Sequence, residues 1–136
     1  MTPLELMIIK HEGIRLKPYK DTMGLITIGV GRCLDTKGIT QEEAYYLLRN
    51  DISEAIEGLQ DTLPWFNQLD DARQDALTDM AFNLGITGLL KFKNMLSAIE
   101  RKDWNTAHNE ALNSTWARQV GPRAIEIANI LLKGEV

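Results

Sequence analysis

Three side chains near the start of the sequence, Glu12, Asp21 and Thr27, could together hydrolyse an acetal bond. This reaction needs one group that protonates the leaving oxygen and another that activates water or attacks from the opposite face, and two carboxyl groups in unlike environments can supply both. If the two carboxyl groups lie roughly 6.5–9.5 Å apart, a water fits between them and the product inverts its configuration. A threonine hydroxyl could hold that water. Spacing alone is weak evidence, because the chain has 19 acidic residues, which are mostly solvated in folded proteins.

A helix followed by a hairpin would bring these side chains together. Residues 2–5 read Thr-Pro-Leu-Glu, which indicates a helix start with a threonine N-cap, proline at the first helical position and glutamate closing a capping box. We expect this helix to end near Gly13, since glycine suits a left-handed C-cap. The stretch from Leu16 to Val30 contains Pro18, a turn cluster at 21–24 and a β-branched run, and it predicts a small antiparallel sheet.

The rest of the chain predicts helices. Residues Thr40 to Glu43 form a second capping box, which opens a long amphipathic helix. Its apolar stripe comprises Ala44, Leu47, Leu48, Ile52, Ala55, Ile56 and Leu59. Pro64 separates it from another helix that ends at Gly85, and shorter helices are expected at about 87–101, 103–113 and 122–133. The fold class is therefore α+β, with a β-containing lobe at 13–38, a connecting helix at 40–60 and a helical remainder.

Composition limits the classes of function. The 136 residues, 44% hydrophobic and 25% charged, suit one compact domain. The net charge is −4, and residues 51–90 hold eight acidic residues and one basic residue, which argues against nucleic acid as the main partner.

The single cysteine excludes an intramolecular disulfide and a cysteine-based zinc cluster, and two distant histidines make a poor metal site, so we expect no metal and no cofactor. The chain has no apolar run long enough for a transmembrane helix and no basic N-terminal region of a secretory signal. We therefore expect synthesis in a cytoplasm and no stable membrane association.

Residues 12–31, which read EGIRLKPYKDTMGLITIGVG, closely resemble the active-site segment of the phage lysozymes related to the T-even phage enzyme. The pattern of that family is E-G-x-R-L-x-x-Y-x-D-x-x-G-x-x-T-I-G-x-G, and each of its fixed positions is matched here. The resemblance continues more loosely at 50–52, at 80–85 and from Trp116 to Ala124, so it spans most of the chain.

This resemblance implies a single lysozyme-like domain over residues 1–136, in which residues 1–12 join residues 62–136 in the helical lobe and a cleft separates the two lobes. It implies hydrolysis of the β-1,4 bond between N-acetylmuramic acid and N-acetylglucosamine in a peptidoglycan glycan strand. Glu12 matches the general acid, Asp21 the carboxylate that assists water, and Thr27 the residue that positions the water. Family members of this type invert the anomeric centre. The family's usual route is accumulation in the host cytoplasm, as a monomer, followed by release through a separate holin to the wall in the periplasm.

Three further residues match positions that the family places near the substrate. Arg123 follows Gly121-Pro122 and corresponds to a basic residue near the catalytic acid, although a solvated arginine at a helix start is an equal alternative. Asn83 could hydrogen-bond an N-acetyl group. Phe82 corresponds to a cleft position but could equally be a core residue at helical spacing.

The chain also departs from the family pattern. Many relatives have histidine where this chain has Arg32, and the matching carboxylate on the long helix is Asp51, so we predict an Arg32–Asp51 ion pair that does not titrate near neutral pH. The stretch between the sheet and the long helix is shorter than in larger relatives. The chain is acidic where those relatives are often basic, which argues against strong electrostatic steering toward an anionic wall.

Two other functions remain open on the sequence. A lytic transglycosylase cuts the same bond with one glutamate and no water, but Asp21 and Thr27 would then be unnecessary. A non-catalytic wall-binding or helical interaction module could share the fold, since fold does not fix function. Retention of all three active-site residue types argues against that second alternative.

Overall fold

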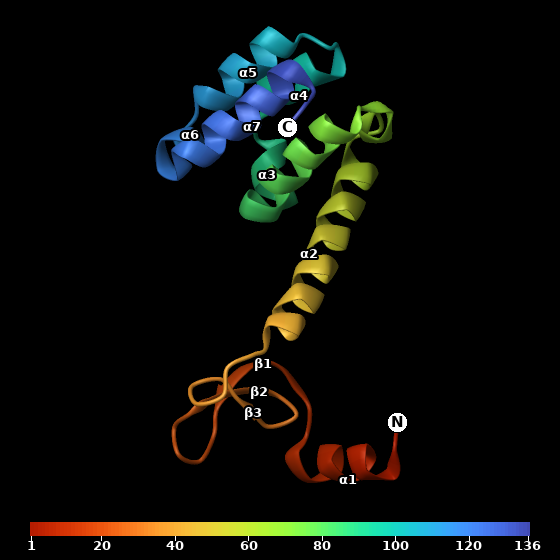
Figure 1. The fold of residues 1–136 in the computed structure, drawn as a ribbon, viewed down its shortest axis with the longest axis vertical. Helices are drawn as coiled ribbons and strands as arrows, with labels where there is room; N and C mark the ends of the chain where they lie inside the picture. The colour runs from red at the N-terminus through yellow and green to blue at the C-terminus, as the bar shows by residue number, and fades with distance from the viewer. The chain divides into compact units, whose positions relative to one another are not determined.

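The computed structural model describes all residues 1–136 and divides them into two compact units, Met1–Leu47 and Leu48–Val136. The predicted α+β class is confirmed, because seven α-helices accompany one small three-stranded sheet (Figure 1). None of the helices has both the length and the apolar composition that crossing a bilayer requires. The predicted grouping of residues 1–12 with the helical lobe concerns the arrangement of the two units and stays a prediction.

Helix α1 (Pro3–Glu12) begins at the predicted capping box. The Thr2 hydroxyl accepts a hydrogen bond from the Glu5 backbone at 3.0 Å, and the Glu5 carboxylate accepts one from the Thr2 backbone at 3.1 Å. The helix ends at Gly13 as predicted, but Gly13 does not have the predicted left-handed helical conformation, because its ψ is 174° at a φ of 76°. A positive φ of this kind is strained for residues that have a Cβ. Glu12 is consequently the last residue of α1.

The predicted antiparallel sheet is confirmed and has the order β1 (Arg15–Lys20), β2 (Ile26–Gly29), β3 (Arg32–Cys33). Thr27 lies in the central strand, opposite Tyr19 on one side and Cys33 on the other. The third strand lies beyond the stretch in which strands were predicted.

Helix α2 (Gln41–Thr62) starts at the second predicted capping box, in which Thr40 and Glu43 exchange hydrogen bonds. Its apolar stripe is buried only toward the C-terminal end. Leu59 is fully buried, and Ala55 and Ile56 are half-buried against the core, whereas Leu47 and Leu48 are exposed. The periodic pattern therefore predicted the helix correctly but did not show which turns are buried.

The second unit is a helical bundle around one apolar core. After η1 (Phe66–Gln68) it contains α3 (Asp71–Leu90), α4 (Lys93–Glu100), α5 (Trp104–Leu112), α6 (Thr115–Val120) and α7 (Pro122–Lys133). Helix α7 lies against α3, α5 and α6 (Figure 1). Gly85 interrupts α3 with φ of 76° and ψ of 159°, at the position where the helix was predicted to end. Helix α6 was not predicted, because its six residues are too few to show periodicity.

Arg73 joins the first turn of α3 to the C-terminus of α7. Its guanidinium donates to the carbonyl oxygens of Leu131 at 2.8 Å and Leu132 at 3.1 Å, and stacks on the Trp104 ring at 3.7 Å. The last carbonyls of a helix have no partner within the helix, so these bonds satisfy groups that would otherwise depend on water. Arg73 therefore stabilises the end of the bundle.

Candidate active site

Asp21 lies in the turn between β1 and β2 and holds that turn with one carboxylate oxygen. Its Oδ1 accepts hydrogen bonds from the backbone of Met23 at 2.8 Å and of Leu25 at 2.9 Å. Gly24 supplies the positive φ of 79° that the turn requires. The other oxygen, Oδ2, has no hydrogen-bond partner in the protein, so it is free to accept a proton or a hydrogen bond from water.

Thr27 is the only buried residue of the first unit, with 4% of its surface exposed. Its hydroxyl donates to the carbonyl oxygen of Leu25 at 3.0 Å, and the same carbonyl accepts the backbone N–H of Asp21 at 2.9 Å. Because the hydroxyl proton is committed to Leu25, the lone pairs of Oγ1 can accept a hydrogen bond from water. Asp21 and Thr27 are thus fixed relative to each other by one shared peptide group.

The Glu12 carboxylate lies against Gly31, in the turn between β2 and β3. A Cβ at position 31 would lie 2.8 Å from Glu12 Oε2, so any other residue there would make the carboxylate move from this position. Gly31 also has φ of 70°, a conformation that residues with a Cβ rarely adopt. The end of α1 and the sheet therefore meet at the carboxylate that the sequence predicts to be the acid.

Arg32 pairs with Glu43 in the structure. The guanidinium makes two parallel hydrogen bonds of 2.8 Å to the Glu43 carboxylate and a third, of 3.0 Å, to the Gly38 carbonyl. The bonds from Arg32, together with the Thr40 backbone N–H, lower the pKa of Glu43 to about 2. The predicted partner, Asp51, belongs to the other unit, so a contact between it and Arg32 stays a prediction.

Asn83 and Phe82, both on α3, differ in their surroundings. The Asn83 side-chain oxygen accepts a hydrogen bond of 2.8 Å from the indole of Trp116, which leaves its amide group free to donate. Phe82 is 44% exposed and lines two shallow grooves of the second unit. The core alternative for Phe82 therefore does not describe this structure, and its contact with substrate stays a prediction.

Arg123 is the second residue of α7 and pairs with Asp79 on α3. Its Nε donates to Asp79 Oδ1 at 2.8 Å, and a second nitrogen approaches the Asp79 carbonyl oxygen at 3.4 Å. Both residues line a groove of about 350 Å³ together with Phe82. Asp79 was not identified from the sequence, because no local pattern distinguishes it from the other acids of α3. The predicted proximity of Arg123 to Glu12 would join the two units and stays a prediction.

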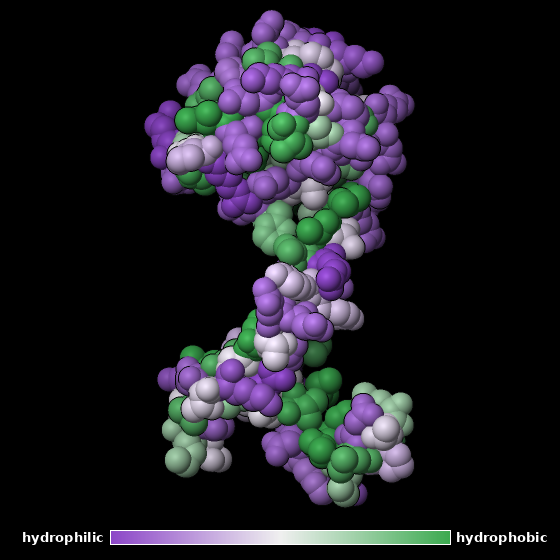
Figure 2. Space-filling view, in the orientation of Figure 1, coloured by the Kyte–Doolittle hydropathy of each residue, from purple (hydrophilic) through white to green (hydrophobic).

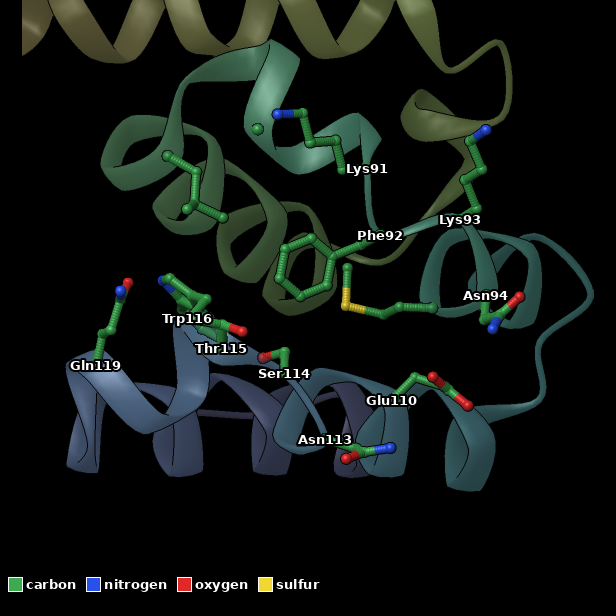
Figure 3. Close-up of a pocket in the computed structure, with 13 residues that line it drawn as sticks. Lys91, Phe92, Lys93, Asn94, Glu110, Asn113, Ser114, Thr115, Trp116 and Gln119 are labelled. Atoms are coloured by element: carbon green, nitrogen blue, oxygen red, sulfur yellow. The ribbon is translucent and has the colours of Figure 1, made fainter.

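A groove of about 540 Å³ lies on the helical unit (Figure 3). Phe92 and Trp116 meet edge to face in its wall, with ring centroids 6.0 Å apart. Lys91, Lys93 and Glu110 bring charges of both signs to its lining. Trp116, whose indole N–H donates to Asn83, is buried, with 4% of its surface exposed.

The first unit can thus supply the parts of an acid–base hydrolysis. Glu12 ends a helix beside the sheet, Asp21 has a free carboxylate oxygen, and Thr27 has a fixed hydroxyl. No group of three or more histidine, cysteine, aspartate or glutamate side chains could hold a metal ion.

Comparisons with known proteins give consistent matches over most of the chain. The profile of the family described as phage lysozyme matches residues 9–128. "Probable T4-type lysozyme 1" of Dictyostelium discoideum is 31% identical over an alignment of 157 positions, which covers 94% of this chain and 92% of that protein. An "Endolysin" of Acyrthosiphon pisum secondary endosymbiont phage 1 is 30% identical, with 87% and 81% covered. The "Pre-baseplate central spike protein Gp5" of Enterobacteria phage T4 is 30% identical over 96% of this chain, which spans only 28% of that longer protein.

Proposed function

This chain belongs to the phage lysozyme family, and we propose that it cleaves the β-1,4 bond between N-acetylmuramic acid and N-acetylglucosamine with inversion of configuration. Membership makes it a lysozyme, an enzyme that lyses peptidoglycan. The finer proposal is supported by one observation above all. The Leu25 carbonyl oxygen accepts hydrogen bonds from both Asp21 and Thr27. The Glu12 carboxylate lies against Gly31, in the turn between β2 and β3 of the same sheet.

In the proposed reaction, the carboxyl group of Glu12 gives its proton to the glycosidic oxygen as the bond from that oxygen to the anomeric carbon breaks. A water attacks the anomeric carbon from the opposite face and loses a proton to Asp21 Oδ2. The water oxygen becomes the new hydroxyl of the product, so the configuration at that carbon inverts. Glu12 ends deprotonated and Asp21 protonated, and exchange with solvent restores both.

The two oxygens of Asp21 have separate tasks in this proposal. Oδ1 accepts two backbone hydrogen bonds and so fixes the plane and direction of the carboxylate. Oδ2 is left as the base. Positioning of this kind lowers the barrier because the reacting groups need no reorganisation when the reaction occurs.

The key experiment compares Glu12→Gln and Asp21→Asn with wild type on outer-membrane-permeabilised bacterial cells. Each change keeps the shape of the side chain but removes its ability to exchange a proton, so lysis should slow by about 10²–10⁴-fold. Glu42→Gln is the matched control, since Glu42 is exposed and makes no hydrogen bond, and it should lyse cells at the wild-type rate. Equal rates for wild type and Glu12→Gln would show that lysis does not depend on this site.

The products decide between mechanisms. NMR of fresh digests should show the α-configured reducing sugar, because an inverting enzyme turns a β-linkage into an α-product. A β-configured first product would contradict inversion. Mass spectrometry would identify a lytic transglycosylase, whose anhydro product is lighter by one water.

We also propose that Phe82, Asn83 and Arg123 contact the glycan strand, and that the enzyme works as a monomer which a separate holin releases from the host cytoplasm to the wall. The family's usual route supports the second part. Light scattering at working concentrations should give the mass of one chain, 15.4 kDa. Alanine at Phe82 should raise KM more than it lowers kcat, because binding contacts act before the reaction.

A further inference from the structure

We propose that Asp35 is a positioning residue for Thr27, acting through the peptide group between Leu25 and Ile26. This inference rests on the proposed function, since it assigns a support to the residue that holds the attacking water. Asp35 follows β3 and is exposed. Its role is visible only in the hydrogen bonds that cross the sheet.

Two residues that follow β3 make hydrogen bonds to the backbone N–H and carbonyl of Ile26. Asp35 Oδ2 accepts the Ile26 N–H at 2.8 Å, and the Leu34 N–H donates to the Ile26 carbonyl oxygen at 2.7 Å. The bond to Asp35 ends on an ionised acceptor, which makes it stronger than a neutral hydrogen bond. Ile26 directly precedes Thr27, so these two hydrogen bonds act at the start of the strand that bears the proposed water-holding residue.

The Ile26 N–H and the Leu25 C=O belong to the same peptide group. That group is planar, so a partner that fixes the direction of its N–H also fixes the direction of its C=O. The Leu25 carbonyl is the acceptor of both the Thr27 hydroxyl and the Asp21 backbone N–H. A carboxylate on the N–H also polarises the peptide group and makes its carbonyl a better acceptor.

Asp35 therefore influences the Thr27 hydroxyl without touching it. The Thr27 backbone is held independently by strand pairing with Tyr19 and Cys33, so loss of Asp35 should leave the strand in place. Loss of Asp35 should instead weaken the hydrogen bond that the Thr27 hydroxyl donates to the Leu25 carbonyl oxygen. A hydroxyl that can rotate offers its proton to water part of the time and then holds the water in the wrong orientation.

The main test is Asp35→Ala against Asp35→Asn. Removing the acceptor should lower kcat on soluble glycan substrate roughly threefold to tenfold, which corresponds to one lost hydrogen bond of ordinary strength, and should leave KM unchanged. Asparagine retains an acceptor oxygen, so Asp35→Asn should recover most of the wild-type kcat. Asp61→Ala, at an exposed aspartate without a hydrogen bond, is the control for loss of a negative charge.

Two further readouts separate positioning from a general structural effect. The backbone amide proton of Ile26 should move upfield in Asp35→Ala, since it loses a hydrogen bond to a carboxylate, and should exchange faster with solvent. In a Thr27→Ala background, Asp35→Ala should cause a much smaller additional loss of kcat, because the hydroxyl that it orients is already absent.

The outcomes distinguish this inference from the proposed function. If Thr27→Ala slows the enzyme but Asp35→Ala matches wild type, or lowers kcat equally in both backgrounds, Asp35 has no positioning role and the proposed function stands. If Thr27→Ala itself is fully active, the proposed role of Thr27 fails and this inference fails with it.

Discussion

The two units of the molecule are built in different ways. In Leu48–Val136, nineteen apolar side chains are buried in one core. In Met1–Leu47, no apolar side chain is buried, and the one buried residue is the polar Thr27. No part of this unit covers the apolar side chains of α1 (Figure 2), namely Leu4, Leu6, Met7 and Ile8.

This difference indicates that the helical unit contributes most of the stability and the first unit supplies the proposed catalytic side chains. Burial of apolar area is the dominant favourable term in folding, so the free energy of unfolding should depend mainly on the helical unit. The first unit is organised by hydrogen bonds, caps and turns, which fix directions accurately but each contribute little net free energy. Residues in that unit should therefore affect activity more than stability, and residues in the helical unit the reverse.

The largest expected effect on stability comes from the helical core. Leu77→Ala removes a fully buried side chain and should lower the free energy of unfolding by about 2–5 kcal/mol, because it leaves a cavity. Leu16→Ala makes the same chemical change in β1, where the side chain is 84% exposed, and should cost no more than about 0.5 kcal/mol. Urea denaturation measures both. Similar losses at the two positions would show that the first unit also depends on apolar burial.

Arg73→Lys should have the next largest effect on stability. A lysine cannot bond two carbonyls and stack on Trp104 at once, so the end of α7 should loosen and the free energy of unfolding should fall by about 2 kcal/mol. The Arg73 side chain is only 11% exposed, so solvent screens these bonds little. Arg101→Ala, which breaks an exposed ion pair of 3.4 Å, is the control and should cost at most about 1 kcal/mol.

Gly31→Ala should lower activity more than stability, in contrast to the substitutions in the helical unit. Its Cβ would displace the Glu12 carboxylate, and kcat/KM should fall about tenfold or more, because small displacements of catalytic groups are costly. Gly38→Ala is the control: its φ of 64° imposes similar backbone strain, but the new Cβ would meet only the Leu34 carbonyl, at 3.9 Å. Equal activities of the two variants would show that the contact with Glu12 has no role.

The smallest expected effect is a pH dependence at Glu43. Its pKa is about 2 in the folded protein, below the ordinary value of 4.5, so its bonds with Arg32 stabilise the fold fully above pH 4.5. That contribution declines as the pH falls from 4.5 toward 2. Glu43→Gln should therefore melt below wild type at pH 6, and the difference should vanish near pH 2.

Asp51→Asn is the matched comparison for that prediction. The structure pairs Arg32 with Glu43, so we expect Asp51→Asn to change the melting temperature between pH 5 and 8 less than Glu43→Gln does. A larger effect at Asp51 would support the Arg32–Asp51 pair predicted from the sequence.

Local sequence patterns predicted most of the fold. Both capping boxes, the antiparallel sheet, the break at Gly85 and the start of α7 at Pro122 follow from a few neighbouring residues whose backbone preferences are strong. The prediction of one helix at about 87–101 was wrong, because the structure divides that stretch between the end of α3 at Leu90 and α4 from Lys93. The other weak points were short elements. Strand β3 has two residues and helix α6 has six, too few for a hydrophobic period to be seen.

By itself, the sequence determined the family and the fold class, and it predicted the three residues of the proposed reaction, since a long motif of fixed spacing specifies them jointly. Only the tertiary structure decided which groups support those residues and which charges meet. Asp35, Glu43 and Asp79 became partners through contacts between different parts of the chain, which join residues 9, 11 and 44 positions apart respectively. Many acidic residues could have filled these places, and the three-dimensional packing of the backbone, rather than any local preference, selects one.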